Sequence, residues 1–243
     1  MNSIPETWNR VLTQDGSRTL LDPEGRACHA SEGAWDQALL RYAAGVEMSK
    51  RGDTKVRLLD VGVGLGLNMA AALAAVEGEG RSLEVTGLEL HLTPLQLAIA
   101  EPEPLANPWH QKVTEALELS LADPELAEAE GVPLGERSRL WLRVGDARET
   151  ILTLPPERRF DAVFLDPFAP KEQSDLWEPD FLRAIAERME PGSRLATYCA
   201  ASAMRADLLR AGLLVGRLGR VGRKAEGTVA GPAPANGAGH FFR

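Results

Sequence analysis

Short apolar runs alternate with helical patterns through most of the chain, and this alternation constrains the fold more than any other feature. Five runs have the length and composition of buried strands: 56–61, 83–90, 139–147, 160–166 and 194–199. Helical patterns follow them, among them the alanine-rich 68–78 and the glycine-terminated 201–212. A helix from Pro94 to about Ile99 with Thr93 as its N-cap, and an acidic helix over 109–130, are also predicted. Strands that alternate with helices form a mostly parallel sheet with helices on both faces. The sequence therefore predicts an α/β fold of Rossmann-like topology.

The same pattern sets the expected domain organisation. Residues 51–230 contain the alternation and are predicted to form one domain, because a chain of 243 residues can bury a self-sufficient core. Residues 1–50 precede it and are expected to be an N-terminal extension that packs on the core. Residues 231–243 are predicted to form a flexible tail. In the final stretch, GTVAGPAPANGAGHFFR, only the two phenylalanines offer bulk to bury.

Composition excludes several classes of protein. Apolar residues make up 44% and charged residues 26%, which is ordinary for a globular protein and excludes disorder of the whole chain. No apolar run reaches the roughly 18–20 residues of a membrane span, and the N-terminus has no secretory pattern. Two cysteines exclude a disulfide scaffold and a zinc site built on cysteine pairs. We therefore expect a cytoplasmic protein with no metal and no membrane partner.

Charge is distributed unevenly along the chain. The net charge is −8, yet residues 200–243 carry seven basic and two acidic residues. A basic segment is typical of a solvated surface, and it is also typical of a seat for a phosphate backbone. Charge alone favours the solvated surface, and the choice depends on what else the sequence contains.

A glycine loop follows the first predicted strand directly. Asp60 is followed by Gly62, Gly64 and Gly66, and a helix begins after them. Glycines let the backbone approach a ligand closely, and the helix N-terminus offers free N–H groups. The spacing is G-x-G-x-G, whereas the dinucleotide fingerprint is G-x-G-x-x-G. The acid before the first glycine suits the amino group of S-adenosylmethionine better than a pyrophosphate, so that cofactor is favoured over NAD.

Acidic side chains end three further predicted strands. Glu89 would accept the ribose hydroxyls of a nucleoside, as strand-end acids do in dinucleotide folds. Asp146 would contact an adenine amino group, with the backbone N–H of Ala147 beside it. Asp166 ends the fourth strand. Because the carboxyl ends of parallel strands meet at one edge of a sheet, these acids and Asp60 are expected to converge there.

The loop Asp166-Pro167-Phe168-Ala169-Pro170 holds the candidate chemistry. Its two prolines stiffen the backbone and remove two donors. The Asp166 carboxylate and the loop carbonyls remain as acceptors for an amine, and Phe168 can pack against a flat base. A proline-stiffened turn with Phe168 in the core is the competing interpretation.

The sequence resembles the methyltransferase half of the MnmC/MnmD family, which modifies the wobble uridine of tRNA. The resemblance covers residues from about 13 to 228. It is carried by DGSRTLLDPEGRACHASEGA, LLDVGVGLGLN, VGDARETILTLP, FDAVFLDPFAPKEQSDLWEPDFL, SRLATYCAASAMRADLLRAG and VGRKAE. The stretch from DPFAP to LW is the most specific part. The family's usual asparagine–proline pair is replaced here by residues 172–175, and the family's GFGRKRE by GRVGRKAE.

The resemblance implies a class I methyltransferase fold and N-methylation of the aminomethyl group of 5-aminomethyl-2-thiouridine, with S-adenosylmethionine as the cofactor. Asp166, Pro167 and Phe168 would form the catalytic loop, and Asn68 would join the cofactor site. Flavin is not expected. A separate oxidase would supply the free amine. The basic segment then becomes the candidate tRNA surface, and its first candidates are Arg220, Arg223 and Lys224.

Two other functions remain open at this point. The same fold and cofactor would serve a methyltransferase for a small amine. A tRNA-binding protein with an inactive methyltransferase fold is the other possibility, although the intact glycine loop and strand-end acids argue against decay of the site.

Overall fold

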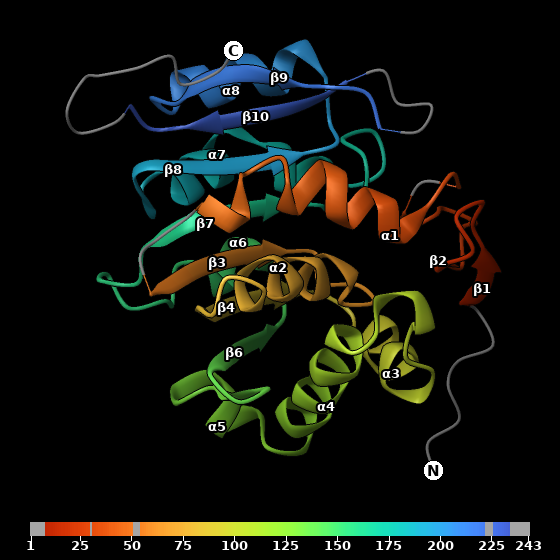
Figure 1. Ribbon diagram of the computed structural model, residues 1–243. Helices are drawn as coiled ribbons and strands as arrows, with labels where there is room; N and C mark the ends of the chain where they lie inside the picture. Colours follow the sequence, from red (N-terminus) through yellow and green to blue (C-terminus); the bar gives the residue numbers. More distant parts are fainter. Residues whose placement is uncertain (1–7, 30, 51–53, 222–225, 234–243) are drawn as a thin grey trace.

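The computed structural model describes residues 8–29, 31–50, 54–221 and 226–233. Within these residues, one eight-stranded sheet has the order β5-β6-β4-β3-β7-β8-β10-β9, and β1 and β2 form a separate hairpin. Strands β3, β4, β6, β7 and β8 run parallel, whereas β5 and β10 pair antiparallel with their neighbours. The predicted mostly parallel α/β fold is confirmed (Figure 1). The strands of the large sheet are β3 (Lys55–Val61), β4 (Ser82–Glu89), β5 (Val132–Leu134), β6 (Ser138–Val144), β7 (Phe160–Leu165), β8 (Met189–Thr197), β9 (Leu214–Leu218) and β10 (Gly227–Gly231).

Helices cover both faces of this sheet (Figure 1). One face carries α1 (Ala34–Asp36), the π-helix η1 (Gln37–Ala43), the 3₁₀ turns η2 (Met48–Lys50) and η3 (Pro104–Ala106), α2 (Leu67–Glu77), α3 (Leu92–Ala100) and α4 (Trp109–Ala122). The other face carries α6 (Ala147–Thr150), the 3₁₀ turn η4 (Ser174–Trp177), α7 (Pro179–Ala186) and α8 (Ser202–Arg210). The short helix α5 (Pro124–Ala129) contacts β6 near the edge of the sheet.

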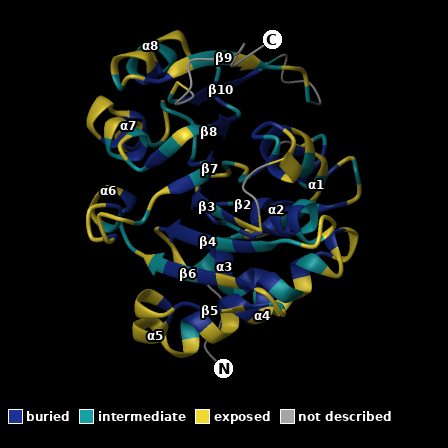
Figure 2. Ribbon diagram, turned by 60° about the vertical axis from the view of Figure 1, so that its left-hand side comes forward, coloured by how far each residue is buried: buried dark blue, intermediate teal, exposed yellow. Residues whose placement is uncertain are grey.

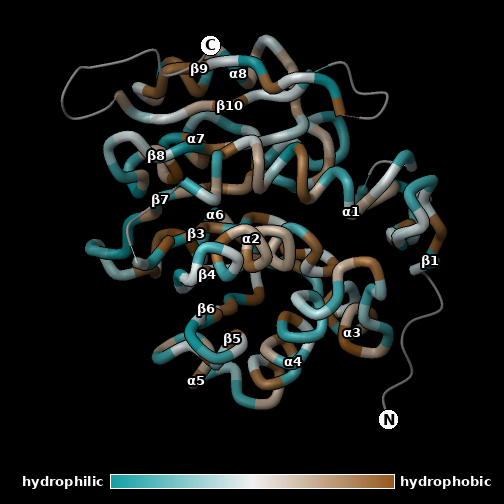
Figure 3. Tube along the Cα trace, in the orientation of Figure 1, coloured by the Kyte–Doolittle hydropathy of each residue, from teal (hydrophilic) through white to brown (hydrophobic). Residues whose placement is uncertain are grey.

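Alternation along the strands divides the core in two. In β3, Leu58 joins the cluster beneath α2, whereas Leu59 and Val61 join the cluster beneath α7. Successive side chains of a strand point to opposite faces, so a continuous apolar run serves both layers of helices. Figure 2 shows the inner strands buried and the outer helix faces exposed, and Figure 3 shows hydrophobic positions on α2 and the strands beneath it.

The N-terminal segment packs against this core. Its hairpin joins β1 (Asn9–Leu12) to β2 (Arg18–Leu21) in antiparallel register. Leu20, Ala38 and Tyr42 are fully buried and belong to the same cluster as Leu58. The sequence pattern missed this hairpin, because its strands are only four residues long.

The C-terminal stretch differs from the prediction. Residues Gly227–Gly231 form β10, a fully buried strand between β8 and β9. The prediction that only the two phenylalanines offer bulk to bury was wrong, since Val229 and Ala230 are buried. Gly231 therefore belongs to the sheet and not to the predicted tail, and residues 234–243 lie outside the described part of the chain.

Two helix boundaries also differ from the sequence pattern. The predicted helix over 109–130 is interrupted at Asp123, whose carboxylate accepts a hydrogen bond from the Leu126 amide at 3.0 Å and caps a new helix. Helix α3 begins at Leu92, two residues before its proline, so Thr93 is not its N-cap. Among the described residues, no helix is long and apolar enough to cross a membrane.

Candidate functional site

A cavity of about 610 Å³ opens at the carboxyl ends of the parallel strands. Its wall combines the glycine loop after β3, the ends of β4 and β6, the loop after β7 and residues 27–29, 31–32 and 37 of the N-terminal segment. Ligands of open α/β sheets bind at this edge. Gly62, Gly64, Glu89 and Asp146 from the predicted cofactor site line the wall, together with Ala147. All three residues of the predicted catalytic loop line it as well: Asp166, Pro167 and Phe168.

The glycine loop depends on backbone conformations that only glycine adopts easily. Gly62 has a φ of 85°, and an added Cβ would lie 2.8 Å from the carbonyl oxygen of Asp166. That contact would force the glycine loop away from the loop after β7. Gly64 also has positive φ, but a Cβ there would meet open space. Gly64 therefore exposes bare backbone on the cavity wall, as a site for a nucleoside cofactor requires.

Glu89 connects the end of β4 to this loop. Its carboxylate accepts hydrogen bonds from the Gly64 amide at 2.8 Å and the His91 amide at 2.9 Å. Burial raises the pKa of Glu89, and the two amide hydrogen bonds lower it in opposition. A carboxylate has about four lone-pair sites, so it can accept hydrogen bonds beyond those from the backbone. The geometry thus leaves Glu89 able to accept hydroxyl groups of a ligand.

Asp146 lies at the rim of the cavity. It caps α6 by accepting from the Arg148 amide at 2.9 Å, and the Arg148 guanidinium contacts it at 2.6 Å. Hydrogen bonds from Arg148 are the largest cause that lowers the pKa of Asp146. Arg148 also reaches Asp175, at 3.2 Å, and so connects the start of α6 to the loop that follows β7.

The Asp166 carboxylate is held by donors from two different elements. Its Oδ1 accepts a hydrogen bond from the hydroxyl of Tyr42 on η1. Its Oδ2 accepts from the side-chain amide of Asn68 on α2, at 2.8 Å. Asn68 is buried and is absent from the cavity wall, so its contact differs from the predicted cofactor contact.

The backbone after Asp166 is fixed by aromatic donors. The Tyr198 hydroxyl donates to the carbonyl of Pro167 at 2.9 Å, and the Trp177 indole donates to the carbonyl of Phe168 at 2.8 Å. The Arg26 guanidinium lies 4.8 Å from the centre of the Phe168 ring, within cation–π range. Two of the carbonyls predicted as free acceptors are therefore already hydrogen-bonded, each through one lone pair.

Asp60 lies behind the cavity wall. It is fully buried, and among the described residues neither of its carboxylate oxygens has a hydrogen-bond partner. Burial, together with the nearby carboxylates of Asp166 and Glu89, raises the pKa of Asp60 well above its usual range. Asp60 and Gly66 belong to the predicted cofactor set, but the structure brings neither to the wall. Gly66 begins α2 in the left-handed conformation, with φ of 77°.

The charge of the wall is strongly negative. Among the described residues that line it, there are six carboxylates and one arginine: Glu32, Glu89, Asp146, Asp166, Glu172, Asp175 and Arg148. Such a wall attracts cationic ligands and repels anionic ones. A sulfonium cofactor with an amino group and a substrate that arrives as an ammonium ion both match this charge.

Comparison with known proteins decides the family. Residues 108–232 match a family model described as S-adenosyl-L-methionine-dependent methyltransferase. The crystal structure of MnmC2 from Aquifex aeolicus is 31% identical and has a TM-score of 0.75, with 95% of this chain and 73% of that chain covered. The chain belongs to this methyltransferase family. The predicted resemblance and the predicted class of enzyme are confirmed.

Curated relatives of this methyltransferase include two bacterial proteins named tRNA 5-methylaminomethyl-2-thiouridine biosynthesis bifunctional protein MnmC. The protein from Pseudomonas aeruginosa UCBPP-PA14 is 39% identical over 105 residues, which cover 42% of this chain and 16% of the relative. The protein from Chromohalobacter salexigens is 34% identical over 127 residues, covering 45% and 18% respectively. The chain thus spans less than a fifth of these relatives. A SAM-bound amino pentose methyltransferase from Micromonospora shares the fold, with a TM-score of 0.50 at 16% identity.

Several residues of the methyltransferase site were not found from the sequence. Tyr42, Trp8, His91 and Arg26 lie on or behind the wall, and none of them is a predicted site residue, although Arg26 lies in the N-terminal stretch that carries the family resemblance. The ring of Trp8 lies 6.1 Å from that of His91. Trp8, Arg26 and Tyr42 approach the site only after the N-terminal segment has packed on the sheet, so no local spacing marks them, whereas His91 follows the end of β4.

The predicted basic surface is described only in part. Arg220 is exposed and follows β9, whereas Arg223 and Lys224 lie outside the described residues. β9 ends at Leu218 beside Gly227, and Thr228 pairs with Thr197 at the end of β8. The connection after β9 therefore leaves the sheet at the same edge as the cavity. The buried Arg41 fixes its start by donating to the carbonyl of Gly219 at 2.8 Å.

Proposed function

We propose that this methyltransferase N-methylates the aminomethyl group of 5-aminomethyl-2-thiouridine at the wobble position of tRNA. The observation that carries the proposal is the Asp166 carboxylate on the wall of an acidic cavity, next to the glycine loop. The similarity to relatives named tRNA 5-methylaminomethyl-2-thiouridine biosynthesis bifunctional protein MnmC supports the substrate class.

The wall fits the proposed cofactor. Gly64 offers bare backbone, and Glu89 has free acceptor lone pairs for the ribose hydroxyls. Asp146 and Ala147 at the rim would receive the adenine. Buried Asp60 and Asn68, with Gly66, would shape the site from behind the wall. When bound, S-adenosylmethionine supplies a methyl group on a sulfonium, which an amine lone pair displaces.

Asp166 is proposed to receive the substrate amine and take its proton. A simple alkyl amine is largely protonated near neutral pH, by analogy with lysine at ~10.4. A carboxylate alone stabilises the ammonium, so proximity does not release the lone pair. Burial in the cavity disfavours both charged forms, and transfer of one N–H proton to Asp166 leaves two neutral groups. The neutral amine then has a lone pair, which turns away from the protonated carboxyl toward the methyl group that S-adenosylmethionine would supply.

Phe168 and the rigid loop are proposed to place the base. The loop is fixed by Tyr198 and Trp177, so the Phe168 ring is held at the cavity wall. Methyl transfer in line is governed by placement of the reacting atoms. The loop therefore contributes to catalysis by holding the Phe168 ring in a fixed position beside the substrate amine.

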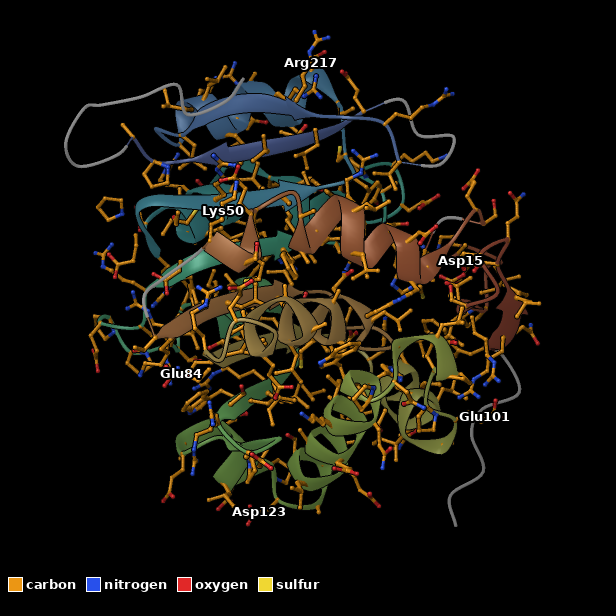
Figure 4. The ribbon with its side chains drawn as sticks, viewed as in Figure 1. Asp15, Lys50, Glu84, Glu101, Asp123 and Arg217 are labelled. Atoms are coloured by element: carbon orange, nitrogen blue, oxygen red, sulfur yellow. The ribbon has the colours of Figure 1, made fainter. Side chains whose placement is uncertain are left out.

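The tRNA is proposed to dock on the segment after β9, through Arg220 together with Arg223 and Lys224. Arg217 on β9 points away from the sheet and adds to this basic surface, with a side chain 77% exposed (Figure 4). Lys/Arg contacts with phosphates supply most nonspecific affinity for nucleic acids. A separate oxidase is proposed as the source of the free amine.

Transfer of a labelled methyl group tests the proposal. Two tRNA preparations are incubated with the full chain and labelled S-adenosylmethionine, one with 5-aminomethyl uridine at the wobble position and one without. We expect label only in the first. Label in neither rejects the wobble-uridine assignment. Label in both places the acceptor elsewhere on tRNA, and label only in free small amines supports the small-molecule alternative.

A further inference from the structure

We propose that Tyr42 is a positioning residue that orients the Asp166 carboxylate toward the substrate amine. This inference rests on the proposed function, in which Asp166 receives the amine. Tyr42 lies in the N-terminal segment, 124 positions before Asp166 in the sequence.

The Tyr42 side chain is held in place by burial and by packing of its ring. The residue is fully buried on the π-helix η1. Its ring packs edge-on against Phe164, with 5.4 Å between ring centres. Phe164 belongs to β7 and lies two residues before Asp166, which follows the same strand. Packing against Phe164 therefore fixes the Tyr42 ring relative to the strand that carries the Asp166 carboxylate.

Two donors together fix both carboxylate oxygens. The Tyr42 hydroxyl donates to Oδ1 of Asp166, and the Asn68 side-chain amide donates to Oδ2 at 2.8 Å. A carboxylate with a single donor can still rotate about its terminal bond, which has a broad torsional preference. With a donor on each oxygen the plane of the carboxylate is set, and Asp166 lines the cavity wall in this orientation. Tyr198 and Trp177 donate instead to the backbone carbonyls of Pro167 and Phe168.

The hydroxyl also stays a donor over the working pH range. Burial, and then the neighbouring Asp166 carboxylate, raise the pKa of Tyr42 well above its usual range. Tyr42 therefore keeps its proton and takes no part in proton transfer. Its role is limited to orientation, and this separates its expected effect from that of Asp166.

Tyr42→Phe provides the test, because it deletes only the hydroxyl and keeps the ring against Phe164. We expect kcat for the tRNA amine to fall about tenfold, with KM for tRNA and Kd for S-adenosylhomocysteine changed less than about twofold. Loss of one buried hydrogen bond should also lower Tm by about 2–4 °C.

Ser138→Ala is the matched control for stability. Ser138 begins β6 at the opposite edge of the sheet, and its hydroxyl accepts a buried hydrogen bond from the Leu83 amide at 2.9 Å. We expect a similar loss of Tm with kcat unchanged. Equal losses of kcat in both variants, or an unchanged kcat in Tyr42→Phe, would overturn the positioning role.

Crystal structures of the wild type and Tyr42→Phe supply a readout that does not depend on the substrate. We expect one Asp166 carboxylate orientation in the wild type and a rotated or mixed orientation in the variant. The same single orientation in both overturns the inference. Inactivity of the wild type on the amine-bearing tRNA instead rejects the proposed function, and the two failures are thus distinguishable.

Discussion

The Glu89 carboxylate accepts a hydrogen bond from the Gly64 amide at 2.8 Å, and this contact joins the end of β4 to the glycine loop after β3. The hydrogen bond fixes the position of the glycine loop, whose backbone is bare at Gly64. It also fixes the Glu89 carboxylate, which is proposed to accept the ribose hydroxyls. A substitution at Glu89 therefore tests both the proposed ribose contact and the position of the glycine loop.

Glu89→Gln should weaken S-adenosylhomocysteine binding by about 10- to 100-fold. The glutamine amide replaces a charged acceptor, and a hydrogen bond to a charged group contributes about 1.5–3 kcal/mol. Because about 1.4 kcal/mol of binding free energy corresponds to a tenfold change in Kd, this loss gives the expected range. Titration calorimetry measures the change. Glu84→Gln, on the same strand at the opposite edge and paired with Lys55, is the control and should bind normally (Figure 4). Equal affinity in Glu89→Gln and the wild type would contradict the assignment.

Asp166→Asn should reduce kcat by about 10²–10⁴-fold, the usual contribution of a positioned proton acceptor. The amide is nearly the same size, so S-adenosylhomocysteine should bind within about threefold of the wild type. Steady-state kinetics and calorimetry separate the two effects. Asp161→Asn on the same strand removes a carboxylate paired with Arg57 and should leave kcat intact. Parallel losses of kcat and cofactor affinity would show that Asp166 serves binding and not proton transfer.

Asp60→Asn should stabilise the protein, and more so at higher pH. The folded pKa of Asp60 is raised well above its usual range, so between about pH 4 and the folded pKa the folded state binds more protons than the unfolded state. Wild-type stability therefore falls as pH rises through this window, and the asparagine variant lacks that loss. We expect a gain of about 1–3 kcal/mol in unfolding free energy at pH 8, and less at pH 5.

Urea unfolding at the two pH values measures this difference. Asp180→Asn is the control, because its side chain is 91% exposed on α7. It should show no pH-dependent gain. A gain in Asp60→Asn that is the same at both pH values would mean that the carboxyl does not titrate differently in the folded state.

Arg220→Glu should weaken tRNA binding and lower the slope of log affinity against log salt by about one, because one phosphate contact is lost. Filter binding over a salt series measures the slope. Lys50→Glu is the control: its side chain is 74% exposed, and it lies near the amino ends of the strands, away from the cavity (Figure 4). Identical slopes for the wild type and Arg220→Glu would contradict a phosphate contact at Arg220 and would indicate that the basic segment is only a solvated surface.

The sheet was predictable because its parallel strands are continuous apolar runs that end at glycines or acids. β10 was not, since GTVAG resembles a flexible linker in composition. Its burial comes from pairing with both β8 and β9, which local composition does not encode. Here tertiary contacts override propensity.

The candidate site divides in the same way. Strand-end residues such as Glu89 and Asp166 reach the cavity because strand direction alone places them there. The contacts of Tyr42 and Asn68 with Asp166 could not be predicted, because they depend on how η1 and α2 pack on the sheet. Asp60 differs from Glu89 in depth: it pairs in register with Gly87, two residues before Glu89, and its carboxylate is buried without a partner among the described residues.

Identification of the product nucleoside tests the proposed function most directly. Wild-type protein and Asp166→Asn are incubated with S-adenosylmethionine and tRNA that carries 5-aminomethyl-2-thiouridine, and the digested nucleosides are analysed by mass spectrometry. We predict that the wild type adds one methyl group to the aminomethyl nitrogen and that Asp166→Asn adds almost none. An unmodified aminomethyl group, or a methyl group found on another nucleoside, would contradict the proposal.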